Sequence, residues 1–269
     1  MRLINKEIYA MEWKSLNQTK RHVFILEKVK VNGEVNSKDL AEELNVSLMT
    51  INRDLKALSE NGELELVYGG AVYKKTNLSE YPMTIKREVN AYGKKLIGEY
   101  CKRLVKPYSS IFIETGTTTL AVAHEIFRTR NCTFYSNSLM VLSTLSKHKD
   151  ISLFSVPGEY RDLSQGFLGV QTIDYIKDFQ FDLVFVGTEG ITLEHGVTLP
   201  DEVDAFTKKA IINQAKQVVL VADKTKFGLS HLYKAGEVKD FDIIITDLPK
   251  DHESFKEMSH VTNIISVAE

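Results

Sequence analysis

Six short apolar runs follow one another through the last two-thirds of the chain, and helix-length segments separate most of them. Continuous apolar strands that alternate with helices are typical of a parallel sheet that helices cover on both faces. Residues 89–269 are therefore predicted to form an α/β domain around a mostly parallel sheet. The six runs read SSIFIE, TFYS, ISLFSV, FDLVFVG, QVVLVAD and FDIIITD.

The first quarter of the chain has a different pattern. From Thr19 onward, apolar positions repeat at helical spacing in three short segments. Ser37 is the expected N-terminal cap of the second helix, and Ser47 that of the third, with a tight turn between the two helices. The segment ELELVYGGAVYK then alternates and turns as a β-hairpin does. Residues 19–75 are therefore predicted to form a winged helix-turn-helix domain.

A polar stretch separates the two predicted domains. It contains Pro82 and little apolar periodicity, so residues 76–88 are predicted to be a linker. Residues 1–18 hold no apolar core of signal-peptide length, and they are predicted to be a short N-terminal extension.

Composition excludes several classes of protein. A formal net charge of −2 over 269 residues argues against a protein that coats nucleic acid generally, although it is compatible with a local basic face. Cys101 and Cys132 lack CxxC spacing, and the seven histidines form no metal-binding pattern, so neither a metal site nor a cofactor is expected. Unpaired cysteines and the lack of any membrane-length apolar run predict a cytoplasmic protein without membrane contact.

The third predicted helix carries hydrogen-bonding and cationic groups near its N-terminal end. Thr50 and Asn52 can meet base edges in a major groove, while Arg53 and Lys56 can contact phosphates or a guanine edge. The alternative is an ordinary solvated helix face. The tight turn and the glycine-containing hairpin favour a helix that reads DNA.

The segment from Ser37 to Ala71 resembles the N-terminal module of the DeoR family of bacterial transcriptional regulators. The family pattern has a Val-Ser start, then Thr-Ile-Arg-Arg-Asp-Leu, and a final Gly-Gly-Ala. Asn52 stands where the family usually has the first Arg, and asparagine pairs with adenine where arginine pairs with guanine. The residues that match are Val46, Ser47, Thr50, Ile51, Arg53, Asp54, Leu55, Gly69, Gly70 and Ala71. The polar face of the helix and this resemblance together predict binding of double-stranded operator DNA through Ser47, Thr50, Asn52, Arg53, Lys56, Gly69 and Gly70.

Polar residues follow the predicted strands of the larger domain. The segment FIETGTTTLAVAHEI turns at Gly116 and begins a helix with Thr117, Thr118 and Thr119, so backbone N–H groups and hydroxyls could hold an anion there. The alternative is simple N-capping by threonine. Later strands end in SNS, VPGEYR, VGTEG and ADKTKFG. Together with Arg161 and Lys226, these ends suit an acidic, hydroxyl-rich small molecule.

The same pieces resemble the C-terminal sensor domain of the DeoR family, a Rossmann-like fold related to ribose-5-phosphate isomerase and the CoA-transferases. This resemblance implies a sugar phosphate as effector. Glu114 replaces a usual Asp, and Pro157 interrupts a usual Gly-Gly pair. The effector contacts that the resemblance implies, together with the cationic rim, are Thr115, Gly116, Thr117, Thr118, Thr119, Asn137, Ser138, Arg161, Glu202, Lys208 and Lys226.

Three functions could account for these features. A sugar-phosphate isomerase with a fused DNA-binding module would need catalytic acids after the fourth strand, where this chain has VGTEGI with Glu189 alone. A domain that only dimerises would not need polar residues at each strand end. A repressor of carbohydrate genes, controlled by a phosphorylated sugar, fits best and predicts no catalytic residues. It also predicts a homodimer or homotetramer, because two reading helices must address two half-sites.

Overall fold

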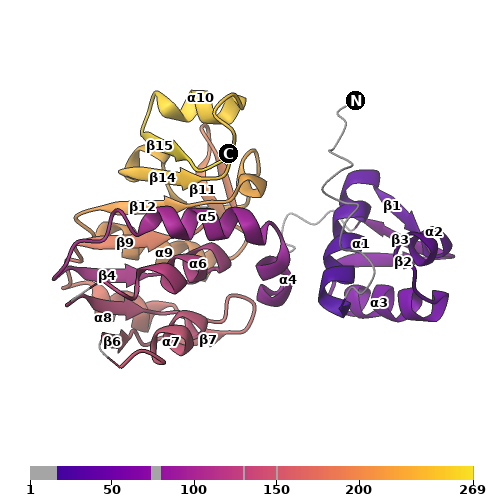
Figure 1. Ribbon diagram of the computed structural model, residues 1–269, viewed down its shortest axis with the longest axis horizontal. Coiled ribbons are helices and arrows are strands. Elements are labelled where there is room, and N and C mark those ends of the chain that lie inside the picture. Colours follow the sequence, from indigo (N-terminus) through magenta and orange to yellow (C-terminus); the bar gives the residue numbers. More distant parts are fainter. Residues whose placement is uncertain (1–16, 74–79, 130, 150, 269) are drawn as a thin grey trace. The chain divides into compact units, whose positions relative to one another are not determined.

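The computed structural model describes residues 17–73, 80–129, 131–149 and 151–268. The chain divides into two compact units, Met1–Val89 and Asn90–Glu269 (Figure 1). Residues 1–16 of the predicted extension lie outside the described residues, as do residues 74–79, which include the start of the predicted linker.

The N-terminal unit combines helices with one small antiparallel sheet. The sheet has the strand order β1-β3-β2, so the third strand pairs with both of the others. The elements are α1 (Gln18–Asn32), β1 (Glu34–Asn36), α2 (Ser37–Glu43), α3 (Leu48–Glu60), β2 (Leu64–Val67), β3 (Gly70–Tyr73) and α4 (Met83–Glu88). The predicted winged helix-turn-helix fold is confirmed.

Local capping explains where the two central helices begin. The Ser47 side chain accepts a hydrogen bond from the backbone of α3, as predicted. The predicted cap at Ser37 is wrong, because Asn36 takes that place and its Oδ1 accepts from Lys38 N at 2.8 Å. Asn36 is the last residue of β1, a three-residue strand that is too short to show an alternating pattern in the sequence.

The core of this unit lies between α1, α2 and α3. Ile25, Ile51 and Leu58 are fully buried in it. Part of the predicted linker also contributes: residues 83–88 form α4, and Ile85 belongs to the same apolar cluster. α4 has only six residues, and its two buried apolar residues, Met83 and Ile85, do not lie at helical spacing, which is why the sequence pattern resembled a linker.

The C-terminal unit is built on a seven-stranded sheet with the order β15-β14-β12-β9-β4-β5-β6. Every neighbouring pair in this sheet is parallel. Its strands are β4 (Ser110–Ile113), β5 (Thr133–Ser136), β6 (Ser152–Ser155), β9 (Leu183–Val186), β12 (Val218–Val221), β14 (Ile243–Thr246) and β15 (Asn263–Ser266). All six predicted strands are present, and β15 adds a seventh at the edge.

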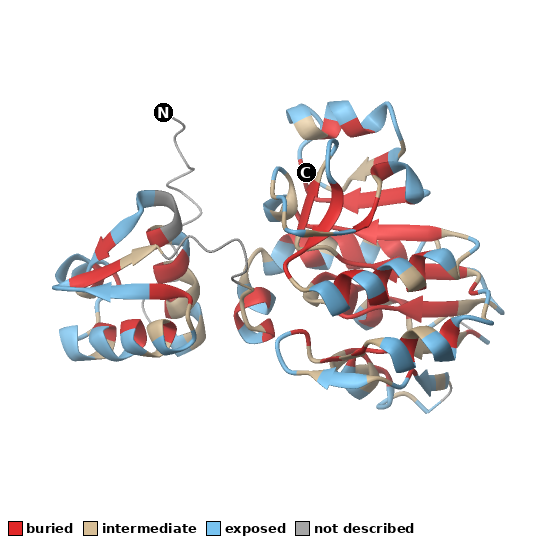
Figure 2. Cartoon of the chain, turned by 180° about the vertical axis from the view of Figure 1, so that it is seen from behind, coloured by how far each residue is buried: buried red, intermediate tan, exposed pale blue. Residues whose placement is uncertain are grey.

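Helices cover both faces of the sheet, as the apolar runs predicted (Figure 1). Successive strand residues alternate between the two cores: Phe112 faces one, while Ile111 and Ile113 face the other. Figure 2 shows the central strands β9, β12 and β14 buried and the outer faces of the helices exposed. The helices are α5 (Ala91–Cys101), α6 (Thr117–Ile126), α7 (Leu139–Leu145), α8 (Val170–Ile176), α9 (Glu202–Asn213) and α10 (Glu253–Ser259), with short 3-10 turns η2 (Lys224–Lys226) and η3 (Val238–Asp240).

Two small antiparallel sheets, which the sequence pattern did not predict, extend from this frame. One is the hairpin of β7 (Glu159–Arg161) and β8 (Gly166–Leu168). The other has three strands, β10 (Gly190–Thr192), β11 (Gly196–Leu199) and β13 (Tyr233–Gly236). Both follow the carboxyl ends of strands of the main sheet, β6 and β9, and they add polar loops at that edge.

Candidate functional site

Helix α3 has a polar face that is open to solvent. Ser47 Oγ accepts from Thr50 N at 3.1 Å and lies 2.9 Å from Thr50 Oγ1, so the cap orients both hydroxyls. Asn52 and Arg53 are exposed, and the Lys56 side chain is 71% exposed with only a 3.8 Å contact to a neighbouring glutamate. The predicted base and phosphate contacts of this helix are therefore accessible on its surface.

A buried carboxylate holds α3 in place. Asp54 is fully buried, and its oxygens lie 2.7 and 3.2 Å from the guanidinium of Arg21 on α1. The same carboxylate lies 3.2 Å from His22 Nε2. In the sequence, Asp54 was only one matching position of a motif, because its partners lie more than thirty residues away. The structure gives it a positioning role beneath the exposed polar face of α3.

The two glycines of the wing have different structural roles. Gly69 has a φ of 80°, which the turn between β2 and β3 requires and which side chains rarely adopt. Gly70 is buried, and a β-carbon there would lie 1.9 Å from the carbonyl oxygen of Val35 on β1. Gly70 therefore permits the close approach of β1 to the wing, whereas Gly69 lies exposed at its tip.

Two exposed apolar side chains lie near these residues. Met49, in the first turn of α3, is 81% exposed, and Tyr68 at the wing tip is completely exposed. Neither was among the predicted contacts. The exposure of Met49 could have been predicted from the sequence, because Met49 lies outside the apolar stripe formed by Ile51, Leu55 and Leu58.

The larger unit has a reversal of strand order at its centre. In chain order, β5 and β6 extend the sheet to one side of β4, and β9, β12, β14 and β15 extend it to the other side. Ligands of open α/β sheets bind beyond the carboxyl ends of the strands at such a switch point. The residues that follow β4 and β9 therefore border the candidate crevice.

A buried ion pair joins the elements beneath this crevice. Lys208 Nζ of α9 lies 2.5 Å from Glu114 Oε2, and both side chains are almost fully buried. The same carboxylate accepts from Gly187 N at 3.2 Å and from Thr115 Oγ1 at 2.7 Å. Glu114 thus links the ends of β4 and β9 to α9. Lys208, which was predicted to contact the effector, is buried as the partner of Glu114.

The loop between β4 and α6 has an N-terminal helix end at the switch point. Gly116, with a φ of 140°, is the residue before the helix, and Thr119 Oγ1 donates to its carbonyl oxygen at 2.9 Å. N–H groups in the first turn of a helix have no partner within that helix. Thr117 is partly exposed and Thr118 is buried, so the predicted threonine cluster is only partly accessible.

The end of β5 meets the β7–β8 hairpin beside this loop. A β-carbon on Gly166 would lie 2.1 Å from Thr115 Cγ2 and 3.3 Å from the carbonyl oxygen of Asn137, so these three residues are in contact. Asn137 is fully buried and donates to Phe167 O at 3.1 Å, while its Oδ1 has no hydrogen-bond partner among the described residues. Ser138 caps α7.

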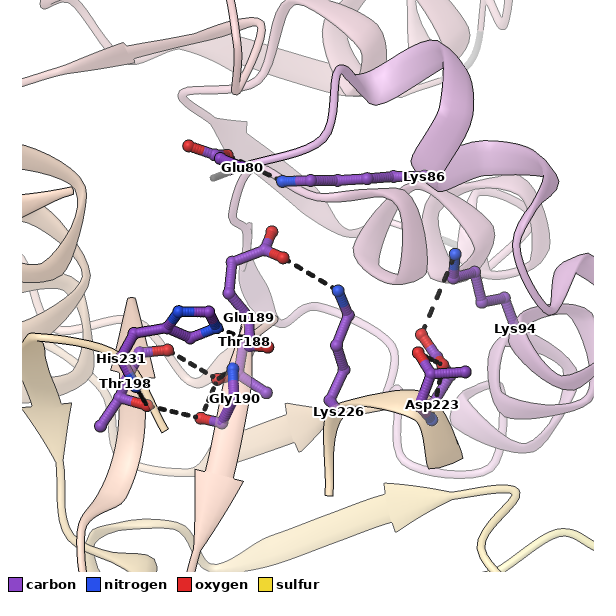
Figure 3. Close-up of polar contacts among 11 residues, drawn as sticks. Glu80, Lys86, Lys94, Thr188, Glu189, Gly190, Thr198, Asp223, Lys226 and His231 are labelled. Carbon is purple, nitrogen blue, oxygen red and sulfur yellow. Dashed lines mark hydrogen bonds and ion pairs between the residues drawn. The ribbon is translucent and has the colours of Figure 1, made fainter. Parts of the chain in front are cut away.

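A second polar group lies beyond β9 and β12. Lys226 Nζ of η2 lies 2.9 Å from Glu189 Oε2, and Figure 3 shows the two side chains directed toward one another. His231 Nε2 lies 3.2 Å from the carbonyl oxygen of Glu189, and Thr188 Oγ1 donates to Gly190 O at 2.7 Å. These contacts fix the loop that presents Glu189.

Two other predicted effector contacts lie near the start of α9. Arg161 Nε lies 3.3 Å from Asp201 Oδ2, the residue that caps this helix. Glu202 is exposed in its first turn. The structure thus joins Arg161 to α9, and it brings Thr115 close to Asn137, but it gives Glu202 no comparable contact.

The described residues offer no clear basis for metal or thiol chemistry. No three histidine, cysteine, aspartate or glutamate side chains form a possible metal site within the described ranges. Burial raises the pKa of the Cys101 thiol, which makes it a poor nucleophile. None of the helices in the described part of the chain is long and apolar enough to cross a membrane.

Comparison with known proteins matches both units. Residues 21–77 match the DeoR-like helix-turn-helix domain, and residues 89–248 match the DeoR C terminal sensor domain. The chain is 32% identical to the glycerol-3-phosphate regulon repressor of Escherichia coli (strain K12) over 234 residues. The aligned region covers 87% of this chain and 92% of that protein. The chain is also 32% identical over 224 residues to the HTH-type transcriptional regulator IolR of Bacillus subtilis (strain 168), covering 82% and 88% of the two chains.

Among solved structures, ribose 5-phosphate isomerase A from Methanocaldococcus jannaschii overlaps 51% of this chain and 55% of its own, with 15% identity and a TM-score of 0.38. The matches over both units are decisive, and the chain belongs to the DeoR family of transcriptional regulators.

Proposed function

We propose that this DeoR-family protein represses genes of carbohydrate metabolism and that a phosphorylated sugar controls it. The names of its relatives support this assignment, since they include a glycerol-3-phosphate regulon repressor and the repressor GlcR. In this proposal, α3 enters the major groove of operator DNA. Asn52 reads a base edge there, while Arg53 and Lys56 contact phosphates or a guanine edge.

One observation supports the effector site above all others: the N-terminus of α6 lies at the switch point of the sheet. First-turn N–H groups and the helix dipole favour an anion at such a place. Thr117 in this first turn is partly exposed, and the backbone of Asn137 lies close to the loop through Gly166. A phosphate at this loop would leave the rest of a sugar to extend across the ends of β9 and β12.

We propose binding without turnover. Isomerising an aldose phosphate requires a carboxylate base near the reacting carbon. The carboxylate that follows β9 belongs to Glu189, which is paired with Lys226. The opposing hypothesis, an isomerase fused to a DNA-binding module, predicts that the bound sugar phosphate is converted.

Control of DNA binding requires that the effector bind two arrangements of the protein with different affinity. In the proposal, two or four copies assemble, so that two reading helices address half-sites about 34 Å apart or a multiple of that spacing. In this proposal, binding of the effector releases the repressor from DNA.

Calorimetry with a panel of sugar phosphates tests the effector site. At least one compound should bind the native chain, and Thr117→Ala combined with Lys226→Ala should abolish this binding while operator affinity is retained. The control is Thr144→Ala combined with Lys147→Ala, because α7 begins at the carboxyl edge of the sheet and these residues lie at or just beyond its far end. Phosphorus NMR of the same mixtures should recover the compound unchanged. Conversion of the sugar, or binding by no member of the panel, would overturn the proposal.

A further inference from the structure

We propose that Met49 is a specificity-determining residue of α3, and that its thioether side chain packs against the C5-methyl group of a thymine in the operator. This inference rests on the proposed function and adds an apolar base contact to the polar contacts of the helix. It predicts that one thymine of the operator contributes to affinity through its methyl group.

Met49 lies on the solvent-exposed side of α3. Successive residues of a helix are about 100° apart, so the residues three, four and seven positions later share its side. These residues are Asn52, Arg53 and Lys56, and all three are exposed. The apolar stripe that packs into the core lies on the opposite side of the helix. Met49 is therefore an apolar side chain, 81% exposed, at the N-terminal end of the row that faces DNA in the proposed function.

The chemistry of this row fits the edge of a base pair in a major groove. Single exposed apolar residues are common on protein surfaces, but Met49 shares its row with an amide and two cations, which suit base edges and phosphates. The apolar group that a base pair presents in this groove is the thymine methyl, which lies beside a carbonyl acceptor. Methionine is flexible and polarizable, so it adapts to an apolar group of this size. A thymine methyl therefore matches Met49.

Asn52 indicates where this thymine lies. Asparagine pairs with adenine, so Asn52 is expected to contact an A·T base pair. Side chains three positions apart on a helix have Cβ atoms about 5–6 Å apart, and successive base pairs are about 3.4 Å apart. The thymine that Met49 contacts therefore lies within about two base pairs of the adenine that Asn52 contacts. The Ser47 cap holds this first turn in place, because Ser47 Oγ accepts from Thr50 N at 3.1 Å.

Replacing thymine with deoxyuridine tests this contact, because uracil lacks only the C5-methyl group. An operator is selected from random duplexes with the full native chain, each of its thymines is replaced singly, and fluorescence anisotropy gives the affinity of each duplex. At one thymine near the base pair that Asn52→Ala identifies, the native chain should lose about fourfold in affinity, the value of one buried methyl-sized group. Met49→Gln keeps the length of the side chain but makes it polar, so it should bind the thymine and uracil duplexes equally. Met49→Leu should retain the preference for thymine.

Val170→Ala is the matched control, because Val170 is also apolar and 82% exposed but lies at the start of α8 in the larger unit. It should leave the preference for thymine unchanged. A native chain that binds every uracil duplex as tightly as the thymine duplex would refute this inference and leave the proposed function standing. A preference that persists in Met49→Gln would refute it as well, because DNA shape and not Met49 would then detect the methyl group. Failure of the native chain to select any duplex would contradict the proposed function itself, and this inference with it.

Discussion

Replacing Asp54 with alanine should destabilise the N-terminal unit severely. The Asp54 side chain is fully buried, and that of Arg21 is only 10% exposed, with three contacts of 2.7 to 3.2 Å between the carboxylate and its two basic partners. Removing one member of a buried pair deprives the other charge of that counter-charge, at a cost of about 3–5 kcal/mol. That loss is a large part of the stability of a small domain.

Amide hydrogen exchange on the full chain measures this effect, because it reports each unit separately. Protection of the buried amides of α3, such as those of Ile51 and Leu55, should fall by the equivalent of about 3–5 kcal/mol in Asp54→Ala. Amides of the main sheet in the larger unit should not change. Lys56→Ala, which breaks an exposed pair on the same helix, is the control and should cost only about 0.5 kcal/mol.

A double replacement separates charge from packing. Arg21→Met with Asp54→Leu removes both charges, and it should recover most of the lost protection, because buried pairs often contribute little beyond an apolar substitute. If Asp54→Ala cost less than about 1 kcal/mol, as an exposed pair does, then Asp54 would not be what positions α3.

Other predictions concern the same unit. Burial raises the pKa of Glu63 to about 7 from 4.5, so the stability that its proton binding provides is complete below pH 4.5 and is lost as the pH rises through 7. The free energy of unfolding changes by about 3 kcal/mol over this pH range. Glu63→Gln should remove this part of the pH dependence when stability is measured by urea unfolding. An unchanged slope of unfolding free energy against pH in the variant would contradict the prediction. Gly70→Ala, which forces a β-carbon to within 1.9 Å of a backbone oxygen of β1, should lower the unfolding temperature more than Gly62→Ala, where nothing lies within 4 Å and only the strain of a φ of 77° is added. In operator binding, Asn52→Ala should cost about 1–3 kcal/mol at one base position, and equal loss on random DNA would refute base reading. Lys56→Ala should reduce the slope of log affinity against log salt by about one unit on all sequences, and an unchanged slope would exclude a phosphate contact.

Much of the fold was predictable because its signals are local. The Ser47 cap, the apolar stripe of α3 and the uniformly apolar strands each depend on neighbouring residues. The missed elements are those whose stability comes from distant partners. β1 has three residues and exists as a strand because it pairs with β3, and α4 is one short helix beside α1. Such segments carry no periodic pattern of their own.

The candidate site shows the same division. The glycine and threonine loop before α6 was predictable, since a strand, a tight turn and a helix start follow one another in the sequence. The role of Lys208 was not, because its partner Glu114 precedes it by more than ninety residues, and only the fold brings α9 under the end of β4. The ion pair of Lys226 with Glu189 likewise depends on the order of the strands.

The central claim is that one unit binds operator DNA and that a phosphorylated sugar held by the other unit controls this binding. An operator is first selected from random duplexes and labelled with a fluorophore. Its fluorescence anisotropy then measures directly how much DNA stays bound as a sugar monophosphate is added to the complex. We expect one such compound to release DNA from the native chain and to leave the complex of the Thr117→Ala, Lys226→Ala variant intact. Operator occupancy that stays constant with every sugar phosphate, or that falls equally in both proteins, would contradict the claim.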